Sequence, residues 1–186
     1  MSTRVRLLIV TGSMGAGKTT ALGEASDVLA QREFVHAALD FDGLAIGRFP
    51  ANMNRREMAI ANLVSIWRNF REAGTTALLL AAAVETRTEL DQLRSVVRPD
   101  ETVCCRLRAS IATMEARVRV REPGILQPHF VRRVRDLDAV LDAAAIEDFW
   151  VANEDRSVTE VAREMLVRAH WLEDAGSAGH SKVSSD

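Results

Sequence analysis

The sequence predicts an α/β fold built on a five-stranded, mostly parallel sheet. Five segments of strand character alternate along the chain with segments of helical periodicity, which is the order that a parallel sheet with crossover helices requires. The chain has 186 residues, of which 47% are hydrophobic and 27% charged. These values are typical of one globular domain with a real core, and they exclude a disordered chain.

Two of the expected strands carry the most information. Residues 5–10 form a continuous apolar run that ends at Thr11-Gly12, as expected of a central buried strand. Residues 34–41 form the second strand, which ends in Asp40-Phe41-Asp42-Gly43 and therefore places carboxylates at its carboxyl end. The remaining strands are expected at 77–84, 102–107 and 148–152.

Helices are expected between these strands, and several have clear ends. Ser110 can cap one helix, which Pro123-Gly124 then breaks, and Ser157-Val158-Thr159-Glu160 is a capping box that starts the last helix. In the helix at 54–73, Trp67 fits the apolar stripe and is expected in the core rather than in a binding site. Further helices are expected at about 18–32, 86–97 and 129–145. A single domain is thus predicted for residues 1–172, and a disordered tail for 173–186, which lack apolar periodicity.

Composition excludes several classes of function. Lys and Arg total 24 against 26 for Asp and Glu, and the net charge of −2 gives no general attraction to nucleic acid or to anionic membranes. No apolar stretch approaches the length of a membrane span and no signal peptide is visible, so we expect a cytoplasmic protein. The adjacent Cys104 and Cys105 lack the spacing of a disulfide framework or a zinc site, and they are expected to be core residues.

A glycine-rich loop follows the first strand. Residues 12–19, Gly-Ser-Met-Gly-Ala-Gly-Lys-Thr, satisfy the pattern G-x-x-x-x-G-K-[ST] between a strand and a helix. Glycines let the backbone amides curl inward around phosphates, Lys18 can reach phosphoryl oxygens, and the Thr19 hydroxyl can bind Mg²⁺. The sequence therefore predicts that the loop binds a nucleotide through Gly12, Ser13, Met14, Gly15, Ala16, Gly17, Lys18, Thr19 and Thr20.

Two further groups of charged residues are candidates for chemistry. Asp40 and Asp42 lie two apart, which on a regular strand puts both on one side, where one could act as a general base and the other could contact a metal. Arg117 and Arg121 lie four apart on one helical face and could clamp a phosphoryl group. The alternatives are a loop cap for the acids and a solvated face for the arginines, in a chain with 22 Arg but only two Lys, Lys18 and Lys182.

The spacing of the glycine-rich loop resembles that of the small P-loop kinases, such as adenylate kinase, gluconate kinase and adenylyl-sulfate kinase. Asp40 and Asp42 resemble the carboxylate beside the acceptor hydroxyl in that group, and Arg117-x-x-x-Arg121 resembles its lid motif. The segment 153–162 looks like the loop and final helix that close over adenine. The chain is also similar to a branch of P-loop proteins that includes the tunicamycin-resistance ATP-binding protein, through Glu147-Asp148-Phe149, Asn153 and Ser157-Val158.

The resemblance implies a three-layer P-loop fold with strand order 2-3-1-4-5 and a short lid near 117–130. It further implies ATP and Mg²⁺ as cofactors, nucleotide contacts from Arg117, Asn153 and Arg156, and transfer of phosphate to the hydroxyl group of a small molecule. In that mechanism Lys18, Asp40, Asp42, Arg117 and Arg121 act in catalysis, and Thr19 and Asp40 bind the metal.

The third strand departs from the family pattern, because 77–84 contains no Asp and Glu85 is the nearest acid. The alternative function is therefore a nucleotide-binding regulatory or interaction protein without efficient phosphotransfer. A GTPase is not expected, because guanine recognition usually relies on an [NT]-K-x-D segment and none can exist when Lys occurs only at 18 and 182. The sequence names neither the phosphate acceptor nor the oligomeric state, monomer or homodimer.

Overall fold

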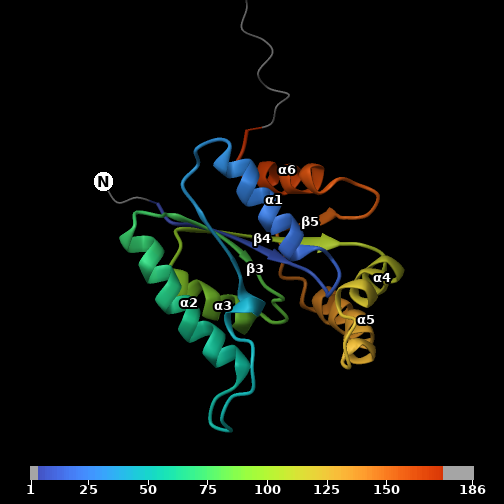
Figure 1. Cartoon of the computed structure of the whole chain (residues 1–186). Helices are drawn as coiled ribbons and strands as arrows, with labels where there is room; N and C mark the ends of the chain where they lie inside the picture. The colour runs from blue at the N-terminus through green and yellow to red at the C-terminus, as the bar shows by residue number, and fades with distance from the viewer. Residues whose placement is uncertain (1–3, 174–186) are drawn as a thin grey trace, which may run out of the picture.

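The computed structural model describes residues 4–173, and a twisted five-stranded sheet lies at its centre (Figure 1). All neighbouring strands are parallel, and their order is β2-β3-β1-β4-β5. The predicted sheet and strand order are therefore confirmed. The strands are β1 (Arg6–Thr11), β2 (Ala37–Asp40), β3 (Ala77–Ala81), β4 (Glu101–Arg108) and β5 (Phe149–Ala152).

Helices cover both faces of the sheet. In Figure 1, α1 and α6 lie together on one face, and α2 and α3 lie on the other, while α4 and α5 stand at the end of β4. The helices are α1 (Lys18–Ala30), α2 (Arg55–Glu72), α3 (Arg87–Val97), α4 (Ile111–Arg121), α5 (Gln127–Ala144) and α6 (Val158–Arg168). The chain thus has the three layers expected of its alternating pattern.

The alternation of side chains along β1 explains why the core has two halves. Leu8 and Val10 face the layer that holds α1 and α6, while Leu7 and Ile9 face the layer that holds α2 and α3. All four are buried, as expected of the central strand of a parallel sheet. Trp67 belongs to the second half, and its indole N–H donates to the carbonyl of Val97 at 3.2 Å, so its predicted place in the core is confirmed.

Two strands are shorter than predicted by more than one residue. The second starts at Ala37 rather than at residue 34, because the ring of Phe34 stacks on Trp171 with centroids 5.6 Å apart instead of packing within the sheet. The third ends at Ala81 rather than at residue 84, although Ala82 and Val84 stay buried. There the amide of Val84 donates to the Thr11 hydroxyl, so the chain turns across the end of β1.

The predicted signals at helix ends are confirmed. Ser110 caps α4 by accepting from the amide of Thr113, and Ser157 and Glu160 form the capping box of α6. Cys104 and Cys105 are buried and free, and burial raises the pKa of the Cys104 thiol to about 12 and that of Cys105 further, so both stay neutral at physiological pH. The predicted tail, apart from Glu173, lies outside the described residues.

A buried arginine joins β4 to α5. Arg106 has no exposed surface, and its guanidinium donates to Asp138 at 2.7 Å and to Asp142 at 2.8 Å, with Glu147 at 3.5 Å. Burial alone would lower its pKa, but the Asp138 hydrogen bond and the three acidic charges raise it above the usual value. The arginine is therefore permanently charged, and the ion cluster fixes α5 to the sheet.

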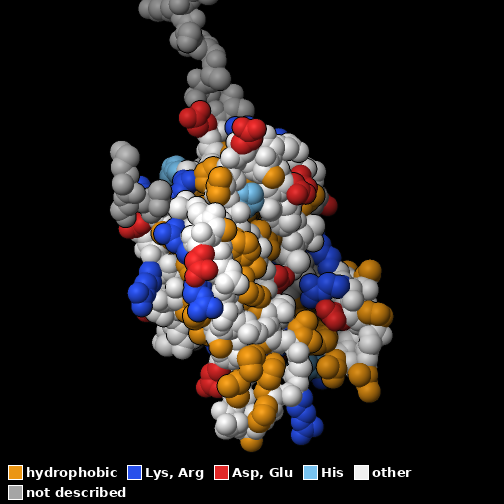
Figure 2. Space-filling view, turned by 60° about the vertical axis from the view of Figure 1, so that its left-hand side comes forward, with side chains coloured by type: hydrophobic (Ala, Val, Ile, Leu, Met, Phe, Trp, Pro, Cys, Tyr) orange, Lys and Arg blue, Asp and Glu red, His pale blue; other side chains and the backbone are white. Residues whose placement is uncertain are grey.

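No helix within residues 4–173 is long and apolar enough to cross a membrane. Exposed apolar side chains are nonetheless prominent in two segments, and Figure 2 shows hydrophobic groups gathered at the lower end of one face. The first segment, between the 3-10 turn after β2 and α2, contains Ile46, which is 81% exposed. The second, between α4 and α5, contains Ile125, which is 97% exposed.

Candidate functional site

The loop between β1 and α1 has the backbone form that its glycines predict. Gly15 and Gly17 have φ values of +76° and +93°, which other residues adopt only with strain. There is also no room for a side chain: a Cβ at Gly15 would lie 2.3 Å from the Met114 carbonyl oxygen, and one at Gly17 would lie 2.2 Å from the Asn153 side-chain nitrogen. The loop is thus pressed between α4 and the β5–α6 connection.

The helix that follows the loop has an open N-terminus. Side chains cap α2, α3, α4 and α6, whereas α1 and α5 have no such cap, and no acid lies in the first turn of α1. Its first amides therefore retain hydrogen-bonding capacity, and the helix dipole adds partial positive charge there. A helix start of this kind, reached through a curled glycine loop, is suited to hold phosphate.

Lys18 reaches back over the same loop. Its ammonium donates to the carbonyls of Gly12 at 2.9 Å and Ser13 at 3.2 Å. Desolvation lowers its pKa from the usual value, while the nearby charges of Asp42 and Asp40 raise it and that of Arg121 lowers it. The loop lysine, both predicted carboxylates and one predicted arginine therefore share one electrostatic neighbourhood.

Two side-chain oxygens that could bind a metal ion lie together beside the lysine. The Thr19 hydroxyl donates to the carboxylate of Asp40 at 2.5 Å. Within residues 4–173 no group of three or more His, Cys, Asp or Glu side chains could hold a metal ion by itself. Mg²⁺ in phosphoryl-transfer sites is usually held by only one or two protein oxygens, with nucleotide phosphates and water completing the shell, so Thr19 and Asp40 fit such an ion.

The prediction that Asp40 and Asp42 share one side of a regular strand is wrong. Asp40 is the last residue of β2, and Asp42 lies in the 3-10 turn Phe41–Leu44 that follows it. The Asp40 carboxylate caps this turn by accepting from the Asp42 amide at 3.1 Å. The cap turns the chain at the sheet edge, so Asp40 faces Thr19 while Asp42 lines a separate hollow.

This second hollow, of about 280 Å³, lies between the turn after β2, the start of α2 and the chain after β3. Arg56 pairs in it with Glu89 at 3.1 Å, and Glu85 is held by Arg133 of α5 at 2.6 Å. Arg55 donates to the backbone carbonyl of Asp42 at 2.8 Å. Among the described residues Arg55 has no carboxylate partner, and its charge is available to a ligand.

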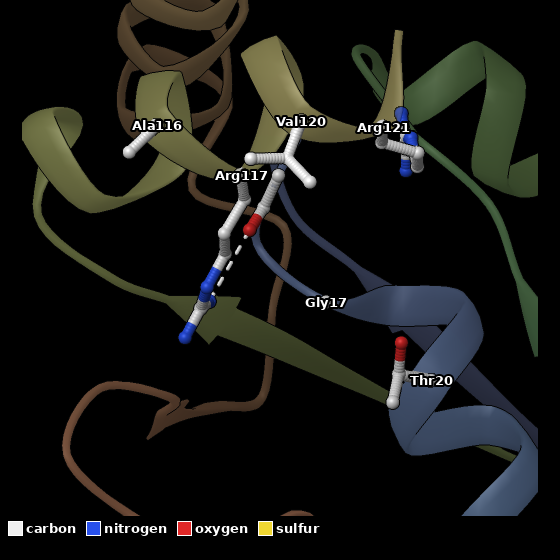
Figure 3. Close-up of a pocket in the computed structure, with 7 residues that line it drawn as sticks. Gly17, Thr20, Ala116, Arg117, Val120 and Arg121 are labelled. Atoms are coloured by element: carbon white, nitrogen blue, oxygen red, sulfur yellow. Dashed lines mark hydrogen bonds between the residues drawn. The ribbon is translucent and has the colours of Figure 1, made fainter.

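A larger hollow of about 450 Å³ lies on the other side of the loop. It is lined by the two loop glycines, by Thr20 of α1 and by one face of α4 that includes Arg117 and Arg121. Figure 3 shows Arg117 extending from α4 toward the loop, with Arg121 further along the same helix above α1. The structure therefore brings both predicted arginines to one hollow, as their spacing indicates.

Arg117 also connects the loop to the β5–α6 connection. Its guanidinium donates to the Gly15 carbonyl at 3.2 Å, the bond drawn dashed in Figure 3, and to the Asn153 carbonyl at 2.9 Å. The Asn153 side chain donates in turn to the Ala16 carbonyl at 2.7 Å. Arg156 lies farther along the connection and pairs with Glu164 of α6 at 2.6 Å. Its predicted nucleotide contact would compete with this pair.

Not every residue of the loop offers its side chain to a ligand. The buried Ser13 hydroxyl donates to the Val134 carbonyl of α5 at 2.8 Å, and Met14 packs against the core. These residues can serve a phosphate only through their backbone amides. The side-chain chemistry of the loop therefore comes from Lys18 and Thr19.

Sequence reasoning assigned no role to Glu154, although the structure places it at the site. Its carboxylate accepts from the Ser110 amide at 2.9 Å and from the hydroxyls of Ser110 and Thr113. The Thr113 hydrogen bond comes first among the causes that lower the pKa of Glu154 to about 2. Only its position next to Asn153 hinted at this role, since the partners lie more than 40 residues away along the chain.

The sequence matches no protein-family model and no curated protein. Solved structures do resemble the fold. Shikimate kinase from Acinetobacter baumannii in complex with shikimate aligns with a TM-score of 0.58 at 16% identity, over 91% of this chain and 94% of that one. A gluconokinase from Sinorhizobium meliloti gives 0.61 at 16% identity, with the same two coverages.

A third resemblance covers nearly the whole of the other protein. The APS kinase CysC of Mycobacterium tuberculosis in complex with AMPPNP and APS aligns with a TM-score of 0.60 at 17% identity, over 91% of this chain and 99% of that one. All three are small P-loop kinases, the group that the glycine-rich loop resembles. The chain has the fold of the small P-loop kinases.

Proposed function

We propose that the protein binds ATP with Mg²⁺ and transfers the terminal phosphate to a hydroxyl group of a small molecule. The observation that carries the proposal is the open N-terminus of α1 behind the glycine loop, with Lys18 and the Thr19–Asp40 pair beside it. These groups offer backbone amides, one ammonium and two metal-binding oxygens at one point. The overall likeness to small-molecule kinases of known structure adds support.

Each group has a part in this proposal. The loop amides and Lys18 would hold the triphosphate, and Thr19 and Asp40 would hold Mg²⁺, which neutralises charge on the phosphate oxygens. Arg117 would lie against the base, because it lines the larger hollow beside the apolar side chains of α4. Arg121, whose charge already acts on Lys18, would approach the phosphates when the lid residues beyond Arg117 close.

The smaller hollow is the candidate acceptor site. Asp42 lines it and lies close enough to Lys18 for its charge to act on the lysine pKa, so it could accept the hydroxyl proton near the transferred phosphate. Arg55, which has no carboxylate partner among residues 4–173, favours an acceptor that carries a carboxylate or phosphate group. We therefore propose a small anionic acceptor with a free hydroxyl group.

A coupled assay of ADP release tests the proposal. ATP and Mg²⁺ are supplied with a panel of hydroxy acids, sugar acids, sugar phosphates and matched neutral sugars. At least one anionic acceptor should stimulate ADP release well above the rate with ATP alone, and Arg55→Ala should raise its KM about tenfold or more, the scale of a lost charge-assisted hydrogen bond. Failure of the whole panel, or equal use of neutral sugars, would reject the anionic acceptor.

One observation favours the alternative, a nucleotide-binding protein without efficient phosphotransfer. No acid occurs in β3 or in the three residues after it, and Glu85 beyond them is paired with Arg133. Thermal-shift and ADP-release measurements together separate the two functions, since both expect ATP and Mg²⁺ to raise the melting temperature but only phosphotransfer releases ADP in response to an acceptor. Stabilisation by ATP without ADP release from any acceptor would support the alternative.

A further inference from the structure

Glu154 holds the start of α4 from outside that helix. The residue lies in the β5–α6 connection, and its two carboxylate oxygens together accept from the Ser110 amide and from the hydroxyls of Ser110 and Thr113. A negative charge at a helix N-terminus is also favoured by the helix dipole. The helix has a cap of its own in Ser110, so Glu154 is not needed to start it. What Glu154 adds is attachment of the helix to another segment.

The attachment has a second point one turn along α4. Arg117 is four residues beyond Thr113 and thus on the same face of the helix, and it donates to the carbonyl of Asn153, the residue next to Glu154. Two neighbouring residues of the connection therefore contact α4 at both ends of one turn, Glu154 at Thr113 and Asn153 at Arg117. Two such contacts fix both the rotation of the helix and its distance from the phosphate-binding loop.

The contacts continue into the loop itself. Arg117 donates to the Gly15 carbonyl, the Asn153 side chain donates to the Ala16 carbonyl, and the Met114 carbonyl lies against Gly15. The larger hollow opens at this junction, with Arg117 in its wall (Figure 3). A small shift of α4 would move the Arg117 guanidinium within the hollow, whereas Lys18 and the open N-terminus belong to a different helix, α1.

We propose that Glu154 is a positioning residue for recognition of the nucleotide base: it anchors α4 so that Arg117 is held in the wall of the base-binding hollow. The inference rests on the proposed function, because it assumes that the loop binds a nucleoside triphosphate. It concerns the base alone. In the proposed function the loop amides and Lys18 hold the phosphates and make no contact with Glu154, while Arg121 approaches the phosphates only on closure.

The experiment compares ATP with inorganic tripolyphosphate, a probe that has the phosphates but no base. Affinities of the full chain for each, with Mg²⁺, are measured by calorimetry for wild type and for Glu154→Gln, in which an amide replaces one of the accepting oxygens. ATP should bind about tenfold more weakly to the variant, the scale of losing one charge-assisted hydrogen bond, while tripolyphosphate affinity should change less than twofold. A general loosening of the site would weaken the binding of ATP and of tripolyphosphate alike, and it would therefore leave the ratio of the two affinities unchanged.

Glu160→Gln is the matched control. Glu160 is also a capping carboxylate with a lowered pKa, due first to its hydrogen bond with the Ser157 hydroxyl, but it serves α6 and has no contact with α4. Its substitution should change the affinity for ATP less than twofold. If Glu154→Gln does not fold, Thr113→Val removes one hydroxyl partner without changing charge, and the same selective loss of ATP affinity is expected at a smaller size.

A double-mutant cycle tests whether Glu154 affects ATP binding through Arg117. If Glu154 acts by placing this arginine, adding Glu154→Gln to Arg117→Ala should weaken ATP binding no further. Fully additive effects, an equal loss for ATP and tripolyphosphate, or no loss for either would each overturn the inference. Wild-type protein that binds neither ligand would instead refute the proposed function, and the inference with it.

Discussion

Gly15→Ala gives a quantitative test of how tightly the phosphate-binding loop is packed. The new Cβ would lie 2.3 Å from the Met114 carbonyl oxygen and 2.9 Å from its carbon, where ordinary contacts are 3.4–4 Å. The loop and α4 would have to separate by about 1 Å, because both of these Met114 atoms belong to the backbone of the helix and cannot rotate away. The φ value of +76° adds strain of roughly 1–2 kcal/mol for an alanine in the left-handed region.

Overpacking of this kind costs about 1–3 kcal/mol more, so the free energy of unfolding should fall by roughly 2–5 kcal/mol. For a chain of 186 residues this corresponds to a drop in Tm of about 10 °C. Since α4 carries Arg117, its displacement should also break the 3.2 Å contact with the Gly15 carbonyl and weaken ATP binding at least tenfold. Calorimetric unfolding and ATP titration measure the two effects.

Gly23→Ala is the control for this variant. Gly23 lies inside α1, has ordinary φ, and a Cβ there would meet nothing within 4 Å. Alanine should stabilise the helix by about 0.5–1 kcal/mol, since glycine is the poorer helix former. A Gly15→Ala protein with the Tm and the ATP affinity of wild type would show that α4 does not lie against the loop, and would refute the reasoning.

Three further predictions follow from the site. Asp40→Asn should weaken Mg²⁺-dependent ATP binding, whereas Asp42→Asn should leave ATP binding intact but lower turnover by about 10²- to 10⁴-fold. Normal turnover in both variants would show that this edge of the sheet takes no part in the chemistry. Arg121→Lys should lower turnover despite keeping the charge, and a non-hydrolysable ATP analogue with Mg²⁺ should reduce proteolysis around residues 119–128; a solvated arginine would show neither effect. Because the pKa of Glu154 is lowered to about 2 from 4.5, its stabilising effect should be full above about pH 5 and should disappear as the pH falls toward 2. The Tm difference between wild type and Glu154→Gln should therefore shrink over that pH range. A constant Tm difference would contradict the role of the charge.

The sequence predicts the fold well because its strongest signals are local. The apolar run of β1, the glycine loop and the caps at Ser110 and Ser157 each act over a few residues, and each is found where expected. Errors occur where apolar residues pack outside the sheet. Phe34 looks like part of a strand but stacks on Trp171, which lies at the other end of the chain.

The site is only partly predictable, for a related reason. Lys18, Thr19 and the two arginines of α4 belong to motifs with fixed spacing, and the structure brings each to the loop. Glu154 and Arg106 have partners between 32 and 44 residues away, which only the packing of α4 and α5 brings near. For Arg106 the available signals were a charge inside an apolar strand and the pair Asp138 and Asp142, spaced for one helical face.

The central claim is that the glycine loop and Lys18 bind the phosphates of ATP. Titration of ATP with Mg²⁺ into wild type and Lys18→Ala, together with the ADP-release assay, tests it most directly. Wild type should bind ATP, while Lys18→Ala, folded to the same Tm within a few degrees, should bind it more weakly and lose phosphotransfer by about 10²- to 10³-fold. Equal ATP affinity and turnover in a folded Lys18→Ala protein would contradict the account.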